Sequence, residues 1–114
     1  MHELDILFLS EKSREEFNDS AKRKGRHGEK RGKLIGRRLD DLRAAINLET
    51  MSMLPGHCHE LKGGRKGQLA INLDGLYRMI FEVANDPVPM KPDGGLDRSR
   101  VSAIRILSIE DYHG

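Results

Sequence analysis

Two alternating segments on either side of Asp74-Gly75 constrain the fold of this chain more than any other feature. Every second residue is apolar over residues 69–73, and the same pattern returns over residues 77–81. A period of two is typical of a strand that buries one face. Asp-Gly is a favoured turn dipeptide, so the sequence predicts a β-hairpin over residues 68–83.

The register of this hairpin decides where Arg78 lies. A two-residue turn would pair Leu73 with Leu76 and place Arg78 on the apolar face, which costs several kcal/mol. A longer turn that pairs Leu73 with Tyr77 exchanges the two faces, because a slip of one residue moves every side chain to the other side of the sheet. We predict this second register. Arg78 then stands on the open face beside Ala70 and can hold a phosphate; a solvated strand arginine is the alternative.

The other elements follow from local patterns. Residues 4–9 form a short apolar run that indicates a buried strand, and residues 101–109 form a longer, β-branched run that suits an interior position in the sheet. Ser13-Arg14-Glu15-Glu16 has the spacing of a capping box and predicts a helix that begins near Arg14. Residues 84–100 contain three of the four prolines and are expected to form a long surface loop. An apolar stripe predicts a second helix, and its residues are Ile35, Leu39, Leu42 and Ile46.

This order of elements predicts an α+β fold, a small antiparallel-rich sheet of topology β-α-α-β-β-β with two helices packed on one face. At 114 residues the chain is expected to form a single domain, 1–114. The only cysteine, Cys58, excludes an internal disulfide framework and fits a reducing cytoplasm. No apolar run approaches the ~20 residues of a membrane helix, and residues 1–3 do not resemble the start of a secretory signal. We therefore expect a cytoplasmic protein.

Residues 22–38 form a basic block that contains nine of the 20 lysines and arginines and a single acidic residue, Glu29. Such a block suggests a polyanionic partner, either nucleic acid or an acidic protein. Gly25, Gly28 and Gly32 interrupt it, so it is expected to be a mobile connection instead of one continuous helix. A flexible basic loop with no specific role is the alternative.

Few of the chemically suggestive motifs predict a known kind of site. His57-Cys58-His59 has no second ligand cluster apart from His113, so no metal site is expected. The glycine-rich segment over residues 62–67 lacks the spacing of a phosphate-binding loop and no helix is expected after it. What is left is a group of cations around one sheet face with an aromatic residue and an imidazole at its end: Lys62, Arg65, Lys66, Arg78, Arg105, Tyr112 and His113.

That group suits metal-free RNA cleavage, which needs no cofactor. The reaction removes a proton from a 2′-hydroxyl, stabilises charge on the phosphorane and protonates the departing 5′-oxygen. His113 can transfer protons near neutral pH, Lys62 and Arg78 can offer fixed cations, and Tyr112 can stack on a base. A penultimate histidine considered alone is more often a solvated tail.

Several motifs, in their order and spacing, resemble the RelE/ParE superfamily of toxins and most closely its HigB branch, the plasmid-maintenance killer proteins. They are Leu54-Pro55-Gly56, His59-Glu60-Leu61-Lys62-Gly63, Gly67-Gln68-Leu69-Ala70-Ile71-Asn72, Leu76-Tyr77-Arg78-Met79-Ile80-Phe81 and Ile109-Glu110-Asp111-Tyr112-His113. The resemblance implies a RelE-like microbial RNase fold and metal-free cleavage of messenger RNA on the translating ribosome, which blocks translation. It also implies that a cognate HigA-like antitoxin neutralises the protein. This antitoxin has a DNA-binding helix-turn-helix, and the toxin is expected to associate with operator DNA only through it.

The resemblance also assigns residues. It implies an active surface, and therefore catalytic roles, for Lys62, Arg78, Asp111, Tyr112 and His113. Arg65, Lys66, Arg105, Lys33 and Arg37 are expected to hold RNA through salt-sensitive phosphate contacts. Two other functions stay open: a non-enzymatic ParE-like inhibitor of DNA gyrase, and a degenerate, non-toxic relative that binds antitoxin or nucleic acid.

Overall fold

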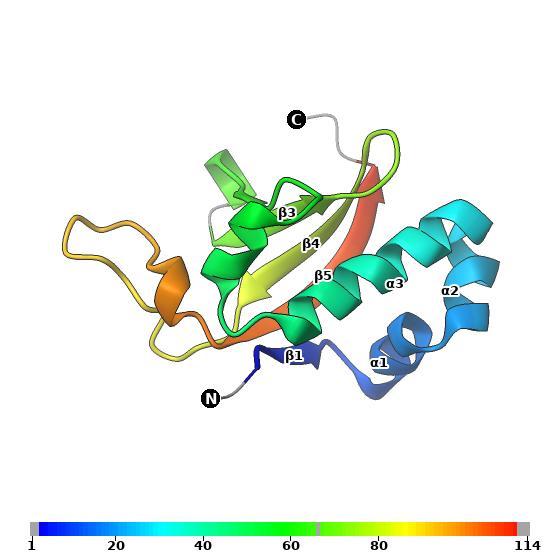
Figure 1. The fold of residues 1–114 in the computed structure, drawn as a ribbon, viewed down its shortest axis with the longest axis horizontal. Coiled ribbons are helices and arrows are strands. Elements are labelled where there is room, and N and C mark those ends of the chain that lie inside the picture. Colours follow the sequence, from blue (N-terminus) through cyan, green and yellow to red (C-terminus); the bar gives the residue numbers. More distant parts are fainter. Residues whose placement is uncertain (1–2, 66, 112–114) are drawn as a thin grey trace.

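The structure is a computed structural model that describes residues 3–65 and 67–111. Five strands form one sheet in the order β1-β5-β4-β3-β2 (Figure 1). The strands are β1 (Asp5–Phe8), β2 (His59–Glu60), β3 (Gln68–Asn72), β4 (Tyr77–Val83) and β5 (Ala103–Asp111). The α-helices are α1 (Glu11–Asn18), α2 (Ser20–His27) and α3 (Glu29–Ala44), and the short 3-10 helices are η1 (Leu48–Met53), η2 (Gly63–Arg65) and η3 (Arg98–Arg100).

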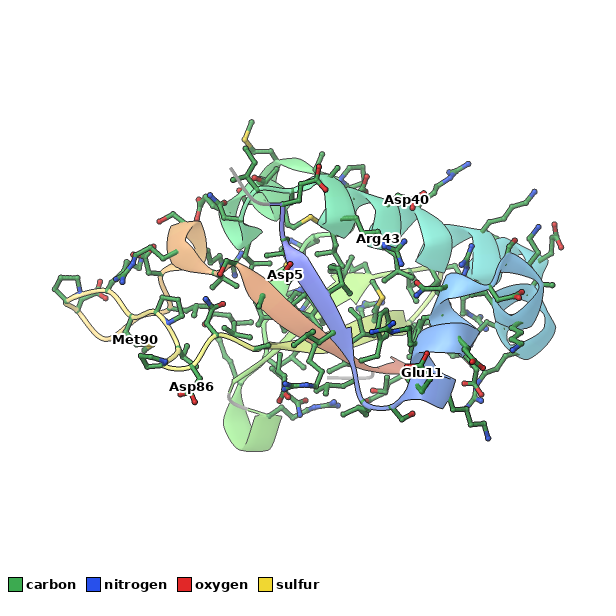
Figure 2. The ribbon with its side chains drawn as sticks, turned by 90° about the horizontal axis from the view of Figure 1, so that it is seen from below. Asp5, Glu11, Asp40, Arg43, Asp86 and Met90 are labelled. Atoms are coloured by element: carbon green, nitrogen blue, oxygen red, sulfur yellow. The ribbon has the colours of Figure 1, made fainter. Side chains whose placement is uncertain are left out.

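The predicted fold class is confirmed: the protein is α+β, with helices on one face of a mostly antiparallel sheet. In the view of Figure 2, α3 and η2 lie on opposite sides of that sheet. The apolar stripe of α3 packs on the alternating apolar residues of the hairpin in one core, which includes Ile35, Leu39, Ile71, Met79 and Phe81. The topology has more elements than predicted, because the described chain holds a third α-helix and the short strand β2.

The predicted hairpin register is confirmed. Asn72 pairs with Arg78 and Ile71 with Met79, and the Leu73 amide donates to the Tyr77 carbonyl at 2.9 Å. Three residues therefore form the turn, and Gly75 adopts a φ of 56° within it, a conformation that glycine reaches without steric cost. The alternating apolar residues consequently share the helix-covered face; they are Leu69, Ile71, Leu73, Tyr77, Met79 and Phe81.

A cation from α3 holds this turn. The Arg31 guanidinium donates to both carboxylate oxygens of Asp74, at 2.9 and 3.2 Å, and its central carbon lies 3.5 Å from the centroid of the Tyr77 ring. The hydrogen bonds from Arg31 keep the pKa of Asp74 below its usual value. The bidentate bond and the cation–π contact together tie the helical layer to the end of the hairpin.

The interior position predicted for the last strand is also confirmed. β5 lies between β4, to which it is antiparallel, and β1, to which it is parallel. The register with β4 shifts between Ile80 and Phe81, which indicates a β-bulge. Beyond that irregularity Arg78 pairs with Glu110 and Tyr77 with Asp111, so β5 ends beside the beginning of β4.

The helix expected near Arg14 begins earlier than predicted. α1 starts at Glu11 because Ser10 is its N-cap, whose hydroxyl accepts a hydrogen bond from the Ser13 amide at 3.0 Å. The hydroxyl of Ser10 therefore fills the position that the capping-box spacing had assigned to Ser13.

Residues 22–38 do not form one continuous helix, as predicted, but the predicted mobile connection is wrong, because this segment is helical except at Gly28. Gly28 has a φ of 88° and separates α2 from α3. Gly32 instead allows close helix packing: a Cβ built on it would lie 2.9 Å from the backbone of Lys24. Arg23 of α2 also joins the helices, because its guanidinium donates to the carbonyls of Phe17 in α1 and Gly32 in α3, at 2.7 and 3.1 Å.

The α3 stripe is confirmed at Ile35, Leu39 and Leu42, which are fully buried. Ile46 does not extend it: α3 ends at Ala44 and the Ile46 side chain is exposed. None of the helices within residues 3–65 and 67–111 is long and apolar enough to cross a membrane.

Residues 84–100 form the predicted long loop, which extends away from the three α-helices (Figures 1 and 2; Asp86 and Met90 are labelled in Figure 2). The loop has internal order, because Met90 forms an isolated β-bridge with Leu96. Its two ends are held to the body of the protein: Asn85 bonds Ser102 and Ala103, and Arg98 donates to the Cys58 carbonyl at 3.3 Å.

We predict opposite effects for alanine at two glycines of the basic block. Gly25→Ala in α2 meets no atom within 4 Å and should raise the free energy of unfolding by about 0.5–1 kcal/mol, because alanine is the better helix former. Gly32→Ala should lower it by about 1–2 kcal/mol, because the added Cβ forces α2 and α3 apart. Urea unfolding, monitored by circular dichroism, measures the free energy of unfolding of each variant. A stabilised Gly32→Ala protein would contradict the close packing.

Candidate functional site

The sheet face opposite the α-helices, here named the open face, contains most of the predicted site residues that the structure describes. Side chains opposite one another on paired strands point to the same face. Arg78 is opposite Asn72 on one side and Glu110 on the other, so these three residues form one row across the open face. Arg78 lies on the predicted face, but its side chain is half-buried and so less exposed than expected.

Arg78 differs from the neighbouring arginines in its partners. Its Nη1 donates to two backbone carbonyls of the turn, those of Gly75 at 3.2 Å and Tyr77 at 3.0 Å. No carboxylate within residues 3–65 and 67–111 forms an ion pair with it. The carbonyls orient the guanidinium and leave its net charge in place.

The face is less open than predicted around Ala70. Ala70 and Ile80 are fully buried, together with Leu61, and Leu107 packs against them. Leu61 belongs to the segment after β2, and its amide donates to the Gln68 carbonyl at 2.9 Å. The next residue, Lys62, is exposed. This segment therefore covers the centre of the open face and presents Lys62 to solvent beside it.

Arg65 and Glu110 form a close ion pair on the open face. Arg65 binds both carboxylate oxygens of Glu110, at 2.6 and 2.8 Å, and the Ser108 hydroxyl donates to the same carboxylate at 2.6 Å. The hydrogen bonds from Arg65 and then Ser108 lower the pKa of Glu110 to about 2. The carboxylate of Glu110, the cross-strand neighbour of Arg78, is thus hydrogen-bonded to Arg65.

Arg105 lies further along the same face and also has an acidic partner. Its Nη1 donates to Glu82 at 2.8 Å, and both side chains are about one-third exposed. Arg65 and Arg105, both expected to hold RNA, therefore have their charge balanced by carboxylates in this structure.

The other predicted site residues that the structure describes do not join this cluster. Asp111 is opposite Tyr77 in the register and so belongs to the helix-covered side of the sheet. Lys33 and Arg37 are exposed on α3, in the other layer of the molecule, and Lys33 lies 3.6 Å from Glu29. Lys66, Tyr112 and His113 lie outside the described residues.

The structure adds an imidazole that the sequence reasoning had considered only as a metal ligand. His59 is opposite Ala70 and so faces the same side as Arg78. Its Nδ1 lies 2.7 Å from the His57 carbonyl oxygen, and the two rings stack with centroids 4.8 Å apart. The signal was present in the sequence, because His59 precedes Lys62 by three residues in one of the motifs quoted for the toxin resemblance.

The neighbouring thiol is not chemically activated. Burial raises the pKa of Cys58 to about 11, so the side chain is a neutral thiol at physiological pH. Within the described part of the chain, no group of three or more histidine, cysteine or acidic side chains could hold a metal ion.

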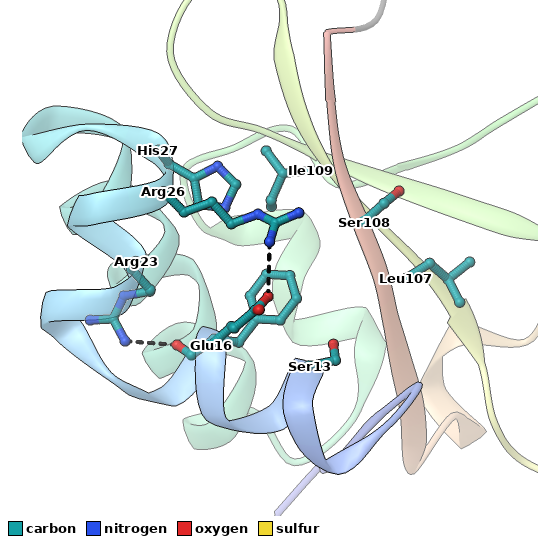
Figure 3. Close-up of a pocket in the computed structure, with 9 residues that line it drawn as sticks. Ser13, Glu16, Arg23, Arg26, His27, Leu107, Ser108 and Ile109 are labelled. Carbon is teal, nitrogen blue, oxygen red and sulfur yellow. Dashed lines mark hydrogen bonds and ion pairs between the residues drawn. The ribbon is translucent and has the colours of Figure 1, made fainter.

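A separate cavity of about 190 Å³ lies between α1, α2 and β5 (Figure 3). The Glu16–Arg26 ion pair at 3.2 Å crosses it, and His27 lines it. Burial and then Arg26 and Arg31 lower the pKa of His27. Among residues 3–65 and 67–111, none of the predicted site residues lines this cavity.

A comparison of the chain with models of known protein families gave no match, and a comparison with curated protein sequences gave none either.

We predict that the Arg65–Glu110 pair stabilises the fold in a pH-dependent way. The folded-state pKa of Glu110, about 2, is below its ordinary value of 4.5. The stabilisation is therefore complete above about pH 4.5 and is lost as the pH falls towards 2. Glu110→Gln should lower the free energy of unfolding by about 1 kcal/mol at pH 7, and its difference from the natural protein should shrink below pH 4.5.

Urea unfolding at a series of pH values measures this difference. The matched control is Glu49→Gln, which removes the same charge from an exposed residue of η1 and should have little effect at any pH. A difference for Glu110→Gln that stayed constant from pH 7 to pH 3 would contradict the linkage.

Proposed function

We propose that this protein is the toxin of a type II toxin–antitoxin module, a HigB-like endoribonuclease that cleaves messenger RNA without a metal ion. One observation carries the proposal: a cation without a carboxylate partner among the described residues, Arg78, shares the open face with an imidazole, His59, and with the exposed Lys62 segment. These are the chemical groups that metal-free cleavage of a phosphodiester requires.

The reaction proposed is attack of a ribose 2′-oxygen on the adjacent phosphorus. A bond forms between that oxygen and phosphorus, the bond from phosphorus to the 5′-oxygen breaks, and the products are a 2′,3′-cyclic phosphate and a 5′-hydroxyl. His59 accepts the 2′-hydroxyl proton and His113, in its protonated form, supplies the proton to the 5′-oxygen. Arg78 and Lys62 stabilise the negative charge that develops on the phosphorane.

The separation of these groups suits a nucleotide between them. His59 and Arg78 are two strands and two residues apart in the register, so their Cα atoms are roughly 12 Å apart. The part given to His113, which lies outside the described residues, rests on the resemblance to the toxin family.

The Arg65–Glu110 pair supports the electrostatics of this arrangement. A carboxylate directly across from Arg78 would neutralise the guanidinium and repel RNA. Because Arg65 binds both oxygens of Glu110, that carboxylate is balanced by another cation. Arg78 keeps its charge for the substrate, where a preorganised cation is most effective.

The expected partners follow from the same proposal. The substrate is messenger RNA in the decoding site of the ribosome, so the toxin acts in the cytoplasm. Its inhibitor is a HigA-like antitoxin with a helix-turn-helix, which also binds the operator DNA.

We predict that Arg78→Ala relieves the growth arrest caused by induced expression of the natural protein. Loss of one charge-stabilising donor should slow cleavage about 10²–10³-fold, while the fold stays intact because Arg78 is only half-buried. Primer extension on cellular mRNA after induction measures cleavage directly. Arg100→Ala is the matched control, because Arg100 is exposed on the long loop and should leave growth arrest unchanged.

We further predict that His59→Ala and His113→Ala each slow mRNA cleavage about 10²–10⁴-fold, the usual contribution of a general acid or base. Purified ribosomes programmed with a defined mRNA provide the assay, and circular dichroism checks folding. Cleavage at the natural rate by both variants would contradict the proposed proton-transfer roles of the two imidazoles.

A non-catalytic relative that binds antitoxin or nucleic acid is the second candidate. It is favoured by the ion pairs of Arg65 and Arg105, which leave fewer cations available for RNA than expected. Growth that continues on induction, with no new mRNA 5′ ends, would favour this function over cleavage.

A further inference from the structure

The backbone before β2 takes an uncommon conformation at His57. Its φ is 46°, and it is the only non-glycine residue with a positive φ in the described part of the chain. This region costs a non-glycine residue roughly 1 kcal/mol or more. Strain of this kind persists only where the surrounding structure imposes it.

Gly56 and its contacts impose the conformation. The Gly56 carbonyl accepts a hydrogen bond from the Asn72 amide at 2.6 Å, which joins this turn to β3. A Cβ on Gly56 would lie 2.6 Å from Ile71 and 2.9 Å from Arg38, so the chain passes close against the core here. The direction in which His57 leaves the turn is therefore determined by packing.

The consequence is a defined contact with His59. The His57 carbonyl oxygen lies 2.7 Å from Nδ1 of the His59 ring, a hydrogen-bond distance. A carbonyl oxygen has no proton to donate, so Nδ1 must be the protonated nitrogen. In a neutral imidazole the other nitrogen, Nε2, then has the available lone pair. The His57 ring also stacks on the His59 ring at an interplanar angle of 24° and limits its rotation.

We propose that His57 is a positioning residue for His59: its strained carbonyl selects the tautomer in which Nε2 is the proton acceptor. The tautomer itself is a property of the fold. Its consequence for RNA cleavage rests on the proposed function, in which His59 accepts the 2′-hydroxyl proton.

Two substitutions separate the carbonyl from the ring. His57→Gly removes the ring and keeps the positive φ readily, because glycine has no Cβ. His57→Val is β-branched and strongly disfavours a positive φ, so it should turn the carbonyl away from His59. The two variants therefore differ in the backbone contact that the proposal invokes, and both lack the stacked ring.

Long-range proton–nitrogen NMR spectra at about pH 8.5, where an ordinary imidazole is neutral, report which ring nitrogen is protonated. We expect His59 to be protonated at Nδ1 in the natural protein and in His57→Gly, and to move towards the Nε2-protonated form in His57→Val. An Nε2-protonated His59 in the natural protein, or an unchanged tautomer in His57→Val, would overturn the proposal.

Cleavage assays on programmed ribosomes then test the consequence. His57→Val should lower kcat about tenfold or more with little change in KM, and His57→Gly should lose less activity than His57→Val. A natural protein with the Nδ1-protonated tautomer but no cleavage would count against the proposed function alone. If the natural protein cleaves RNA and the two variants have the same kcat, the result would count against the positioning role alone.

Discussion

The guanidinium of Arg31 joins the helical layer to the tip of the sheet, and the geometry of the proposed site depends on this junction. It binds Asp74 through two hydrogen bonds and covers the Tyr77 ring, so it determines the shape of the turn between β3 and β4. The turn sets the hairpin register, and the register puts the alternating apolar side chains of both strands on the helix-covered face. Arg78 lies on the other face, where it is half-buried, only because that register is kept.

The arginines discussed above divide into two groups by what their guanidinium groups contact. Arg23, Arg31 and Arg38 bind backbone carbonyls or a turn carboxylate and hold helices to each other and to the sheet. The basic block therefore contributes to structure as well as to surface charge. On the open face the arrangement is different, because Arg65 occupies Glu110 while Arg78 contacts only carbonyls among the described residues.

The proposed site combines segments that are far apart in the chain. Lys62 and His59 come from β2 and the segment after it, Arg78 comes from the start of β4, and Glu110 comes from the end of β5. Antiparallel pairing brings these positions into adjacent rows. The covering residue Leu61 packs against Ala70 and Ile80, which fixes where its neighbour Lys62 reaches the surface.

The sequence alone determined the elements whose signal is local: the alternating strands, the register that keeps a guanidinium out of the core, the α3 stripe and the proline-rich loop. It failed where the deciding atoms belong to distant residues. Gly32 looks like a helix breaker until Lys24 is seen to pack against it, and Arg65 looks like an RNA ligand until Glu110 is seen to bind it. Likewise, only the tertiary structure decided that the His57 carbonyl contacts the His59 ring. The backbone angle responsible is imposed by packing against β3 and Arg38, and no local sequence pattern encodes it.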